Sequence, residues 1–463
     1  MADFTTYEGV VAYAKQILIS FAQNAKVAIF NDPNNQILTI KGKETAIREV
    51  QTNGAGDYTG AWGDGNGNAE VDYKNYYAPY DRGFSASIDS VKEAQSFVEG
   101  GKPSLVGVAQ EFIKKHLAPE IDTAILSRWA NQVTNKITNN TSGYGITKST
   151  IIETLTNIAK DISNAGYDGD IVVFISATVN AIFEQALLEK NILMNEVVME
   201  RIMTREEIVE GFEPLKVEFR VRRFNNMIIV PVPDDRMAGK VLMLNGISVG
   251  QTDGGVLPQK NNSSYFDINI LAIPFDAAYA NIRHIVSQMF VPANVPTEDY
   301  GENINLANEK LFGVLTLENV GVNPFGDGFK FNNRTLYGGD IFEKYRDACV
   351  LVKSANGTVA VTPKSASFVG AESDLTGAST ATDTPKFIIE PANASGTVYF
   401  ASATTASATV EASKSISVGD DGIPYVAPTV TYGATAGTSK ISAYSDSDKT
   451  VKIGEITVTS TGT

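Results

Sequence analysis

Residues that carry catalytic and metal chemistry are scarce in this chain of 463 residues. It has one cysteine, Cys349, and two histidines, His116 and His284. A single thiol excludes an intramolecular disulfide framework, and three such side chains cannot form a four-ligand Cys/His zinc cage or most catalytic triads. We therefore expect a function that resides in surfaces, with no catalytic site and no cofactor.

Basic residues are also in deficit. The 38 Lys and Arg face 53 Asp and Glu, which gives a formal net charge of −15. Tight binding of nucleic-acid phosphates requires clustered Lys and Arg, so a protein whose main work is gripping DNA or RNA is disfavoured. Contact with any polyanion is expected to be weak.

Long apolar runs are missing as well. A membrane-spanning helix needs roughly 20 mostly apolar residues, whereas the best runs, at residues 171–175 and 227–232, are only as long as a strand. The opening residues 1–4 (MADF) lack the basic patch that begins a secretory signal. These features favour an aqueous, cytoplasmic compartment and no membrane partner.

The composition changes near Ser354. From there to Thr463 the chain has no Arg, His, Met, Cys or Trp, and about a third of its residues are Ser or Thr. Short β-prone runs separated by turn residues recur along it at 387–389, 396–400, 408–412, 429–432, 440–444 and 451–458. Their alternating apolar residues predict a small β-sandwich, because the alternative, a disordered or mucin-like tail, lacks an apolar face.

The first 350 residues predict mixed helix and strand. An apolar face repeats at helical spacing from Pro103 through Val133, with a bend expected at Pro119. A second amphipathic helix at 151–162 should end at Gly166, and Ser176 should cap the helix that follows a buried strand at 170–175. A further buried strand is expected at 227–230.

A segment rich in glycine and tyrosine spans residues 51–89. Its pattern predicts a long two-stranded excursion with a turn near residues 64–68. An isolated hairpin is marginally stable and this one carries many aromatic rings, so we expect a neighbouring copy of the chain to cover it. The alternative is a loop folded onto its own domain. The candidate inter-subunit contacts are Tyr58, Trp62, Tyr73, Tyr76, Tyr77, Tyr80 and Arg82.

Other chemical motifs are weak. Residues 64–68 (DGNGN) resemble the start of a calcium loop, but Ala69 stands where that loop needs glycine and Asn75 where it needs glutamate. Cys349 lies in an apolar run and is expected to act as a small buried hydrophobe. The arginines at 220, 222 and 223 are expected to be solvated or paired with a neighbouring subunit, which is favoured over the alternative, a contact with packaged nucleic acid. No metal site is predicted.

Several runs, in order along the chain, resemble the major capsid proteins of tailed bacteriophages, which have the Hong Kong 97-type fold. They are residues 80–89 (YDRGFSASID), 118–130 (APEIDTAILSRWA), 171–176 (IVVFIS), 229–237 (IVPVPDDRM), 273–278 (IPFDAA) and 340–352 (DIFEKYRDACVLV). The C-terminal part is similar to the bacterial immunoglobulin-like domains that some phages append to capsid proteins.

The resemblance implies an α+β capsid fold followed by an all-β immunoglobulin-like sandwich. The implied parts are an N-terminal arm (1–50), an extended loop (51–89), a peripheral domain with a spine helix at 103–139 (90–146), an axial domain (147–285), a return to the peripheral domain (286–353) and the β-domain (354–463).

The same resemblance implies a structural subunit, not an enzyme. Pentamers and hexamers of the chain would assemble in the bacterial host cytoplasm into the icosahedral head of a virion that encloses double-stranded DNA. A portal and a separate scaffold protein are the implied partners, with decoration or host-surface contact through the β-domain. Some relatives cross-link a lysine of the extended loop, where this chain has only Lys74, and the partner stays open. The alternatives are an encapsulin-like nanocompartment shell and a surface adhesion protein.

Overall fold

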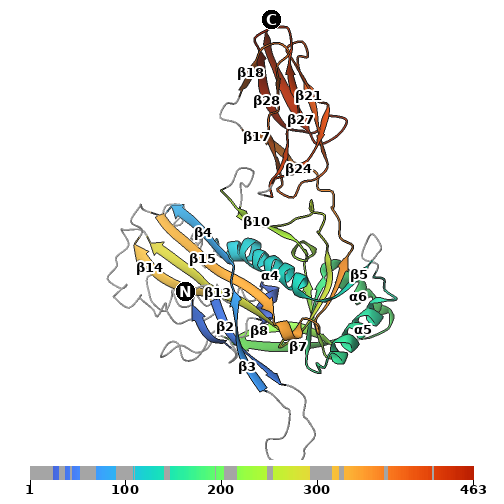
Figure 1. Ribbon diagram of the computed structural model, residues 1–463. Coiled ribbons are helices and arrows are strands. Elements are labelled where there is room, and N and C mark those ends of the chain that lie inside the picture. Colours follow the sequence, from blue (N-terminus) through green and yellow to red (C-terminus); the bar gives the residue numbers. More distant parts are fainter. Residues whose placement is uncertain are drawn as a thin grey trace, which may run out of the picture. The chain divides into compact units, whose positions relative to one another are not determined.

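The computed structural model describes residues 24–30, 37–41, 44–52, 69–89, 108, 110–139, 146–192, 194–202, 216–247, 254–291, 315–322, 328–369, 374–419 and 422–462. The chain divides into two compact units. Unit 1 comprises Met1–Ile137, Ile146–Pro233 and Ile270–Leu351, and unit 2 comprises Thr138–Gly145, Asp234–Asn269 and Val352–Thr463. Helices and sheets are mixed in unit 1, whereas strands dominate unit 2 (Figure 1).

A seven-stranded mixed sheet, which lies mainly in unit 1, forms its centre. In sheet order the strands are β5 (Asn135–Asn139), β16 (Val350–Ser354), β12 (Ile268–Pro274), β6 (Ile171–Ser176), β9 (Met227–Val232), β8 (Lys216–Phe224) and β7 (Asn195–Ile202). β6 and β9 run parallel, and every residue of β6 is buried. A run of Val, Ile and Phe suits a strand covered on both faces, so the buried strands predicted at 170–175 and 227–230 are confirmed.

Two helices follow the sequence pattern closely. α5 (Ile151–Asn164) buries Ile151, Leu155, Ile158 and Ile162 along one face, and Gly166 beyond its end has φ +88°. α6 (Ala177–Glu189) contacts β6 and β9, and the backbone N–H of Val179 donates to Ser176 Oγ at 3.4 Å. Both predicted helices, the Ser176 cap and the Gly166 stop are therefore confirmed.

The predicted spine helix ends earlier than expected. A π-helical turn, η2 (Ile113–Leu117), precedes α4 (Ala118–Gln132), and the chain is extended at Val133 before β5 begins. The interruption before Pro119 agrees with the expected disturbance, since proline offers no N–H to the carbonyl four residues earlier. The predicted end at residue 139 was wrong, because residues 135–139 (NKITN) pair as an edge strand of the sheet.

A four-stranded sheet packs against α4, which crosses β15 (Figure 1). Its order is β14 (Leu315–Val322), β13 (Ala278–Val291), β15 (Gly328–Ile341) and β4 (Tyr80–Asp89). Beside α4 lies a short 3₁₀ turn, η1 (Lys26–Phe30), whose Val27 N–H donates to the buried Asp122 at 3.0 Å. Part of the predicted N-terminal arm is thus packed into the core of unit 1.

The tyrosine-rich excursion belongs to a three-stranded sheet of β1 (Ile37–Lys41), β2 (Glu44–Thr52) and β3 (Ala69–Tyr77). β2 and β3 pair antiparallel from Thr52 opposite Ala69 to Glu44 opposite Tyr77. The first strand of the ribbon therefore begins at Glu44, seven residues before the boundary expected from glycine and tyrosine content. Residues 80–89 pair instead with β15.

Unit 2 contains a two-stranded hairpin and a β-domain. The hairpin is β10 (Val241–Asn245) with β11 (Gly254–Pro258). The β-domain has three sheets, β17-β20-β25-β24, β18-β28-β27-β21-β23 and β19-β26-β22. Their bounds are β17 (Ser365–Phe368), β18 (Asp374–Gly377), β19 (Thr382–Asp383), β20 (Phe387–Glu390), β21 (Thr397–Ser402), β22 (Ala408–Val410), β23 (Ser413–Ser415), β24 (Ser417–Val418), β25 (Pro424–Val426), β26 (Val430–Tyr432), β27 (Gly437–Tyr444) and β28 (Lys452–Ser460).

The β-domain has its own apolar core. Every buried member of that core lies between Ala366 and Val458, and the largest rings are Phe387, Phe400 and Tyr432. All six predicted β-runs coincide with observed strands, so the expected folded β-rich domain is confirmed, and a disordered tail is excluded for the described part of this region.

Candidate assembly surface at the root of the β-ribbon

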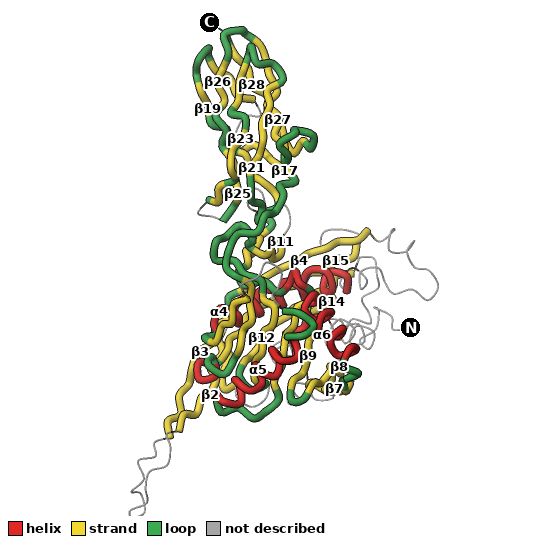
Figure 2. The backbone as a smooth tube through the Cα atoms, turned by 90° about the vertical axis from the view of Figure 1, so that its right-hand side faces the viewer, coloured by secondary structure: helices red, strands yellow, loops and turns green. Residues whose placement is uncertain are grey.

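The β2–β3 ribbon extends away from the rest of unit 1 (Figure 2). Ala78 and Pro79 lie between β3 and β4 and form the corner at its base. The main contact of this three-stranded sheet with other described elements is between β3 and β15. At that contact β15 carries Gly338, and a Cβ built there would lie 2.7 Å from Pro79 Cδ and 2.8 Å from the backbone oxygen of Tyr77. Only glycine lets the corner pass this close to β15.

Tyr76, near the end of β3, packs into the core of its own chain. Tyr76 is 8% exposed and forms a cluster with Tyr279 and Phe342, against which Tyr345 also packs. The Tyr76 and Phe342 rings meet edge to face with centroids 5.6 Å apart, a favoured aromatic geometry. The sequence predicted a contact with a neighbouring copy here, but the ring is already covered by its own chain.

Lys74, one pleat earlier on β3, forms an ion pair with Glu343. Lys74 Nζ lies 2.5 Å from Glu343 Oε2, and this hydrogen bond and positive charge lower the pKa of the Glu343 carboxyl. The Glu343 side chain is 54% exposed, so the pair adds little stability. The pair lies beside the Tyr76 cluster, because Glu343 follows Phe342 in the chain.

Tyr77 is the described ribbon tyrosine that faces outward most clearly, with 51% of its surface exposed. Tyr73 lies opposite Arg48 in the β2–β3 register, and its side chain lies outside the described residues. Tyr58 and Trp62 fall within residues 53–68, which are also outside them. Tyr77 is therefore the predicted contact residue that the described surface supports best.

The remaining two candidates, Tyr80 and Arg82, turn toward α4 and β15. The Tyr80 ring lies 5.2 Å from that of Tyr337, and burial raises the pKa of the Tyr80 hydroxyl. Arg82 Nε donates to Glu120 at 2.7 Å, and the Tyr337 hydroxyl donates to the same carboxylate at 2.6 Å. Glu120 thus joins β4, β15 and α4, so both candidates have partners within their own chain.

Alkaline pH should weaken this joint. Burial, and then the negative charge of Glu120, raise the pKa of the Tyr337 hydroxyl well above its ordinary 10.0. The folded state therefore retains a proton that the unfolded chain loses above about pH 10, so this stabilisation is complete below pH 10 and declines as the pH rises beyond it. We expect the melting temperature to fall more steeply above pH 10 in the natural protein than in Tyr337→Phe. Equal slopes would contradict the assignment.

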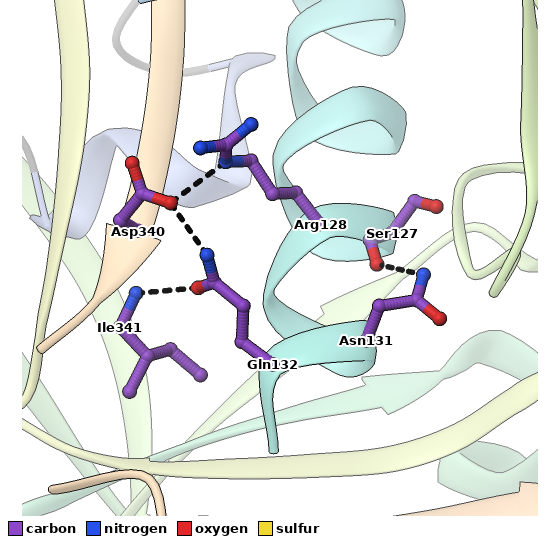
Figure 3. Close-up of polar contacts among 6 residues, drawn as sticks. All are labelled: Ser127, Arg128, Asn131, Gln132, Asp340 and Ile341. Atoms are coloured by element: carbon purple, nitrogen blue, oxygen red, sulfur yellow. Dashed lines mark hydrogen bonds and ion pairs between the residues drawn. The ribbon is translucent and has the colours of Figure 1, made fainter. Parts of the chain in front are cut away.

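A second polar joint fixes α4 to the end of β15 (Figure 3). Arg128 Nε donates to Asp340 Oδ1 at 2.7 Å, and Gln132 Nε2 donates to the same oxygen at 2.5 Å. Gln132 Oε1 in turn accepts the backbone N–H of Ile341 at 2.8 Å. No pattern in the sequence indicated this joint, because α4 and the end of β15 are more than 200 residues apart along the chain.

The cysteine, histidine, calcium-loop and arginine candidates form no functional site among the described residues. Cys349 is completely buried, and burial raises the pKa of its thiol, as expected of a small hydrophobe. His116 is exposed beside the Phe112 ring, and the side chain of His284 lies outside the described residues, as does the DGNGN segment. Arg222 pairs with Glu184 and Arg223 with Asp170, both within the chain.

Neither a metal site nor a membrane-spanning helix is found among the described residues. No group of three or more His, Cys, Asp or Glu side chains there is arranged to hold a metal ion. Within the same residues, no helix combines the length and apolar character needed to cross a membrane.

The sequence matches no protein-family model and no curated protein. Similar solved structures include one from Mycobacterium phage Che8 (11% identity, 71% of this chain and 91% of that chain, TM-score 0.37) and the capsid of cyanophage P-SCSP1u (13%, 69% and 86%, TM-score 0.38). An encapsulin complex from Synechococcus elongatus is also similar (12%, 66% and 81%, TM-score 0.31). With TM-scores below 0.5, no conclusion about the function of this chain follows from these likenesses.

Proposed function

We propose that this chain is the major capsid protein of a tailed bacteriophage, a structural subunit without catalytic activity. Copies of it would form the pentamers and hexamers of an icosahedral shell around double-stranded DNA. The observation that carries the proposal is the β2–β3 ribbon, which is anchored firmly at one end, by Tyr76 and the corner over Gly338, and runs away from the rest of its unit (Figure 2).

A ribbon of this kind is poorly suited to a monomer. Small sheets gain independent stability from a layer packed on their face, whereas the main described contact of this three-stranded sheet is between β3 and β15. Tyr77, at the base of the ribbon, has half of its surface exposed. A second copy of the chain supplies a matching surface at every position of a symmetric assembly. Interfaces of about 1,600 Å² each, repeated around every subunit, are then enough to close a shell.

The charge supports a container in preference to a DNA-binding protein. A net charge of −15 favours weak contact with packaged DNA, because the phosphates find few clustered cations to hold them. Portal and scaffold proteins would be the further partners of such a shell. The C-terminal β-domain, which we propose to be immunoglobulin-like, would be available for decoration or host-surface contact.

Electron microscopy of the native assembly, with nuclease treatment of its contents, tests the proposal. We expect closed shells that protect double-stranded DNA. Shells filled with a protein cargo would instead establish a nanocompartment of the encapsulin kind. A monomer, or an open assembly without a lattice, would refute the shell proposal.

Removing aromatic rings from the ribbon should impair assembly while the fold survives. We expect Trp62→Ala combined with Tyr77→Ala to give soluble subunits with a near-natural melting temperature and few closed shells, because aromatic side chains contribute strongly to binding at interfaces between copies. Sedimentation velocity measures the shell fraction. Tyr444→Ala, in the β-domain, is the matched control, and a natural shell yield from the double variant would refute the role of the ribbon.

A further inference from the structure

The segment Asp234–Asn269 and the C-terminal part from Val352 belong to one compact unit although about 80 residues separate them in sequence. The segment contains the β10–β11 hairpin and a loop, residues 258–267, that follows it. The apolar core of the β-domain includes only residues 366–458, so no residue of this loop belongs to that core. The contacts between the loop and the domain therefore require another explanation.

The loop meets the β-domain at one of its turns. Asn393 is 7% exposed, and its Nδ2 donates to the backbone oxygen of Pro258 at 2.8 Å. In the other direction Asn261 Nδ2 donates to the backbone oxygen of Ala394 at 3.4 Å. Since the loop supplies a backbone carbonyl and an amide donor to adjacent residues of the same turn, the two surfaces are complementary in hydrogen bonding.

The connecting segment between β16 and β17 is also held. The backbone N–H of Gly357 donates to the oxygen of Tyr265 at 3.0 Å, and that of Val359 donates to the oxygen of Lys260 at 2.8 Å. The backbone N–H of Val361 in turn donates a hydrogen bond to Ser395 Oγ at 3.0 Å. A flexible tether would leave these amides to water, so the linker forms part of the joint.

The base of the loop is closely packed as well. Lys353 Nζ lies 4.6 Å from the centroid of the Phe266 ring, within the range of a cation–π contact. A Cβ on Gly239 would come within 2.2 Å of the same ring, so the hairpin base accommodates Phe266 only with glycine at that position. These contacts fix the loop from which the β-domain is held.

We propose that residues 258–265 form a docking socket for the chain's own C-terminal β-domain, with the turn 393–395 as the docked element. With this socket, the β-domain is held rigidly against the β10–β11 hairpin and is not connected through a flexible linker alone. The domain then presents its surface in one orientation relative to that hairpin, whatever the partner of that surface is. The inference concerns the intact chain and does not depend on shell formation.

Hydrogen exchange of the full chain, followed by mass spectrometry, tests the socket. In the natural protein we expect peptides covering residues 355–361 to exchange at least about tenfold more slowly than an unstructured chain. Asn393→Asp replaces the donor with a carboxylate facing the Pro258 carbonyl, and should speed this exchange about tenfold. Asn157→Asp is the matched control, because Asn157 is an exposed residue of α5 in unit 1, and it should change little.

A second variant guards against unfolding of the β-domain. Asn261→Asp alters the loop side of the joint and leaves the β-domain sequence intact, so it should also speed exchange at 355–361 while peptides of β27 and β28 stay protected. Exchange of residues 355–361 at the unstructured rate in the natural protein would overturn the proposal. So would natural protection of these residues in both Asn393→Asp and Asn261→Asp.

Discussion

Gly338→Ala is expected to abolish closed shells while leaving a soluble, folded subunit. The new methyl group would meet Pro79 Cδ at 2.7 Å, the backbone oxygen of Tyr77 at 2.8 Å and Ala78 Cα at 2.9 Å. Two of these atoms belong to the backbone and the third to a rigid ring, so the corner itself has to shift. Overpacking of this kind costs about 1–3 kcal/mol of unfolding free energy.

The larger effect falls on assembly. In the proposed shell, a displaced corner would redirect the ribbon in every copy, and the error would recur at each symmetry-related contact. Thermal unfolding measures the modest loss of stability, and sedimentation velocity with electron microscopy measures the loss of shells. Gly357→Ala is the matched control, since a Cβ at that position meets nothing within 4 Å. Natural shells from Gly338→Ala would show that the direction of the ribbon does not matter.

Glu120→Ala is expected to be the most destabilising single substitution among the polar joints. The Glu120 side chain is 9% exposed and accepts hydrogen bonds from Arg82 and from the Tyr337 hydroxyl, which belongs to a completely buried residue. Its removal leaves a buried hydroxyl without this acceptor and a largely buried cation without this carboxylate. We expect a loss of about 3 kcal/mol, the lower end for a broken buried pair, because Arg82 retains some contact with water.

Two comparisons isolate the cause. Tyr337→Phe removes one donor and keeps the Arg82–Glu120 pair, so it should cost only about 1 kcal/mol. Asp81→Ala removes a carboxylate from β4, the strand that also carries Arg82. The side chain of its partner Arg334 is 70% exposed, and such surface pairs contribute about 0–1 kcal/mol. Denaturant unfolding gives all three values. If Glu120→Ala lowered the free energy of unfolding no more than Asp81→Ala does, Glu120 would not hold β4, β15 and α4 together as described above.

Local patterns in the sequence predicted many elements correctly. The buried strand at 170–175, the amphipathic helix ended by Gly166 and the Ser176 cap each depend on residues that lie close together along the chain. The end of the spine helix was missed, because Val133 through Asn139 leave the helix to pair at a sheet edge. A tertiary partner overrode the helical pattern there.

The tyrosines of the ribbon show which features the sequence predicts and which depend on the tertiary structure. Their spacing identified a two-stranded excursion, and β2 and β3 form it. The sequence treated all of its rings as equivalent contacts with neighbouring copies. The tertiary structure instead buries Tyr76 in its own chain, places the Tyr80 ring beside that of Tyr337 and leaves Tyr77 half exposed.

By itself the sequence determined the scarcity of catalytic groups, the acidic balance, the mixed-fold body and the separate β-rich C-terminal domain, since composition and short-range periodicity are properties of the chain alone. Only the tertiary structure decided which side chains hold the ribbon, how Glu120 and Asp340 join α4 to β15, and where the β-domain is docked. Those contacts join residues about 130 to more than 200 positions apart, and their partners are chosen by the packing of the whole fold, which no local pattern encodes.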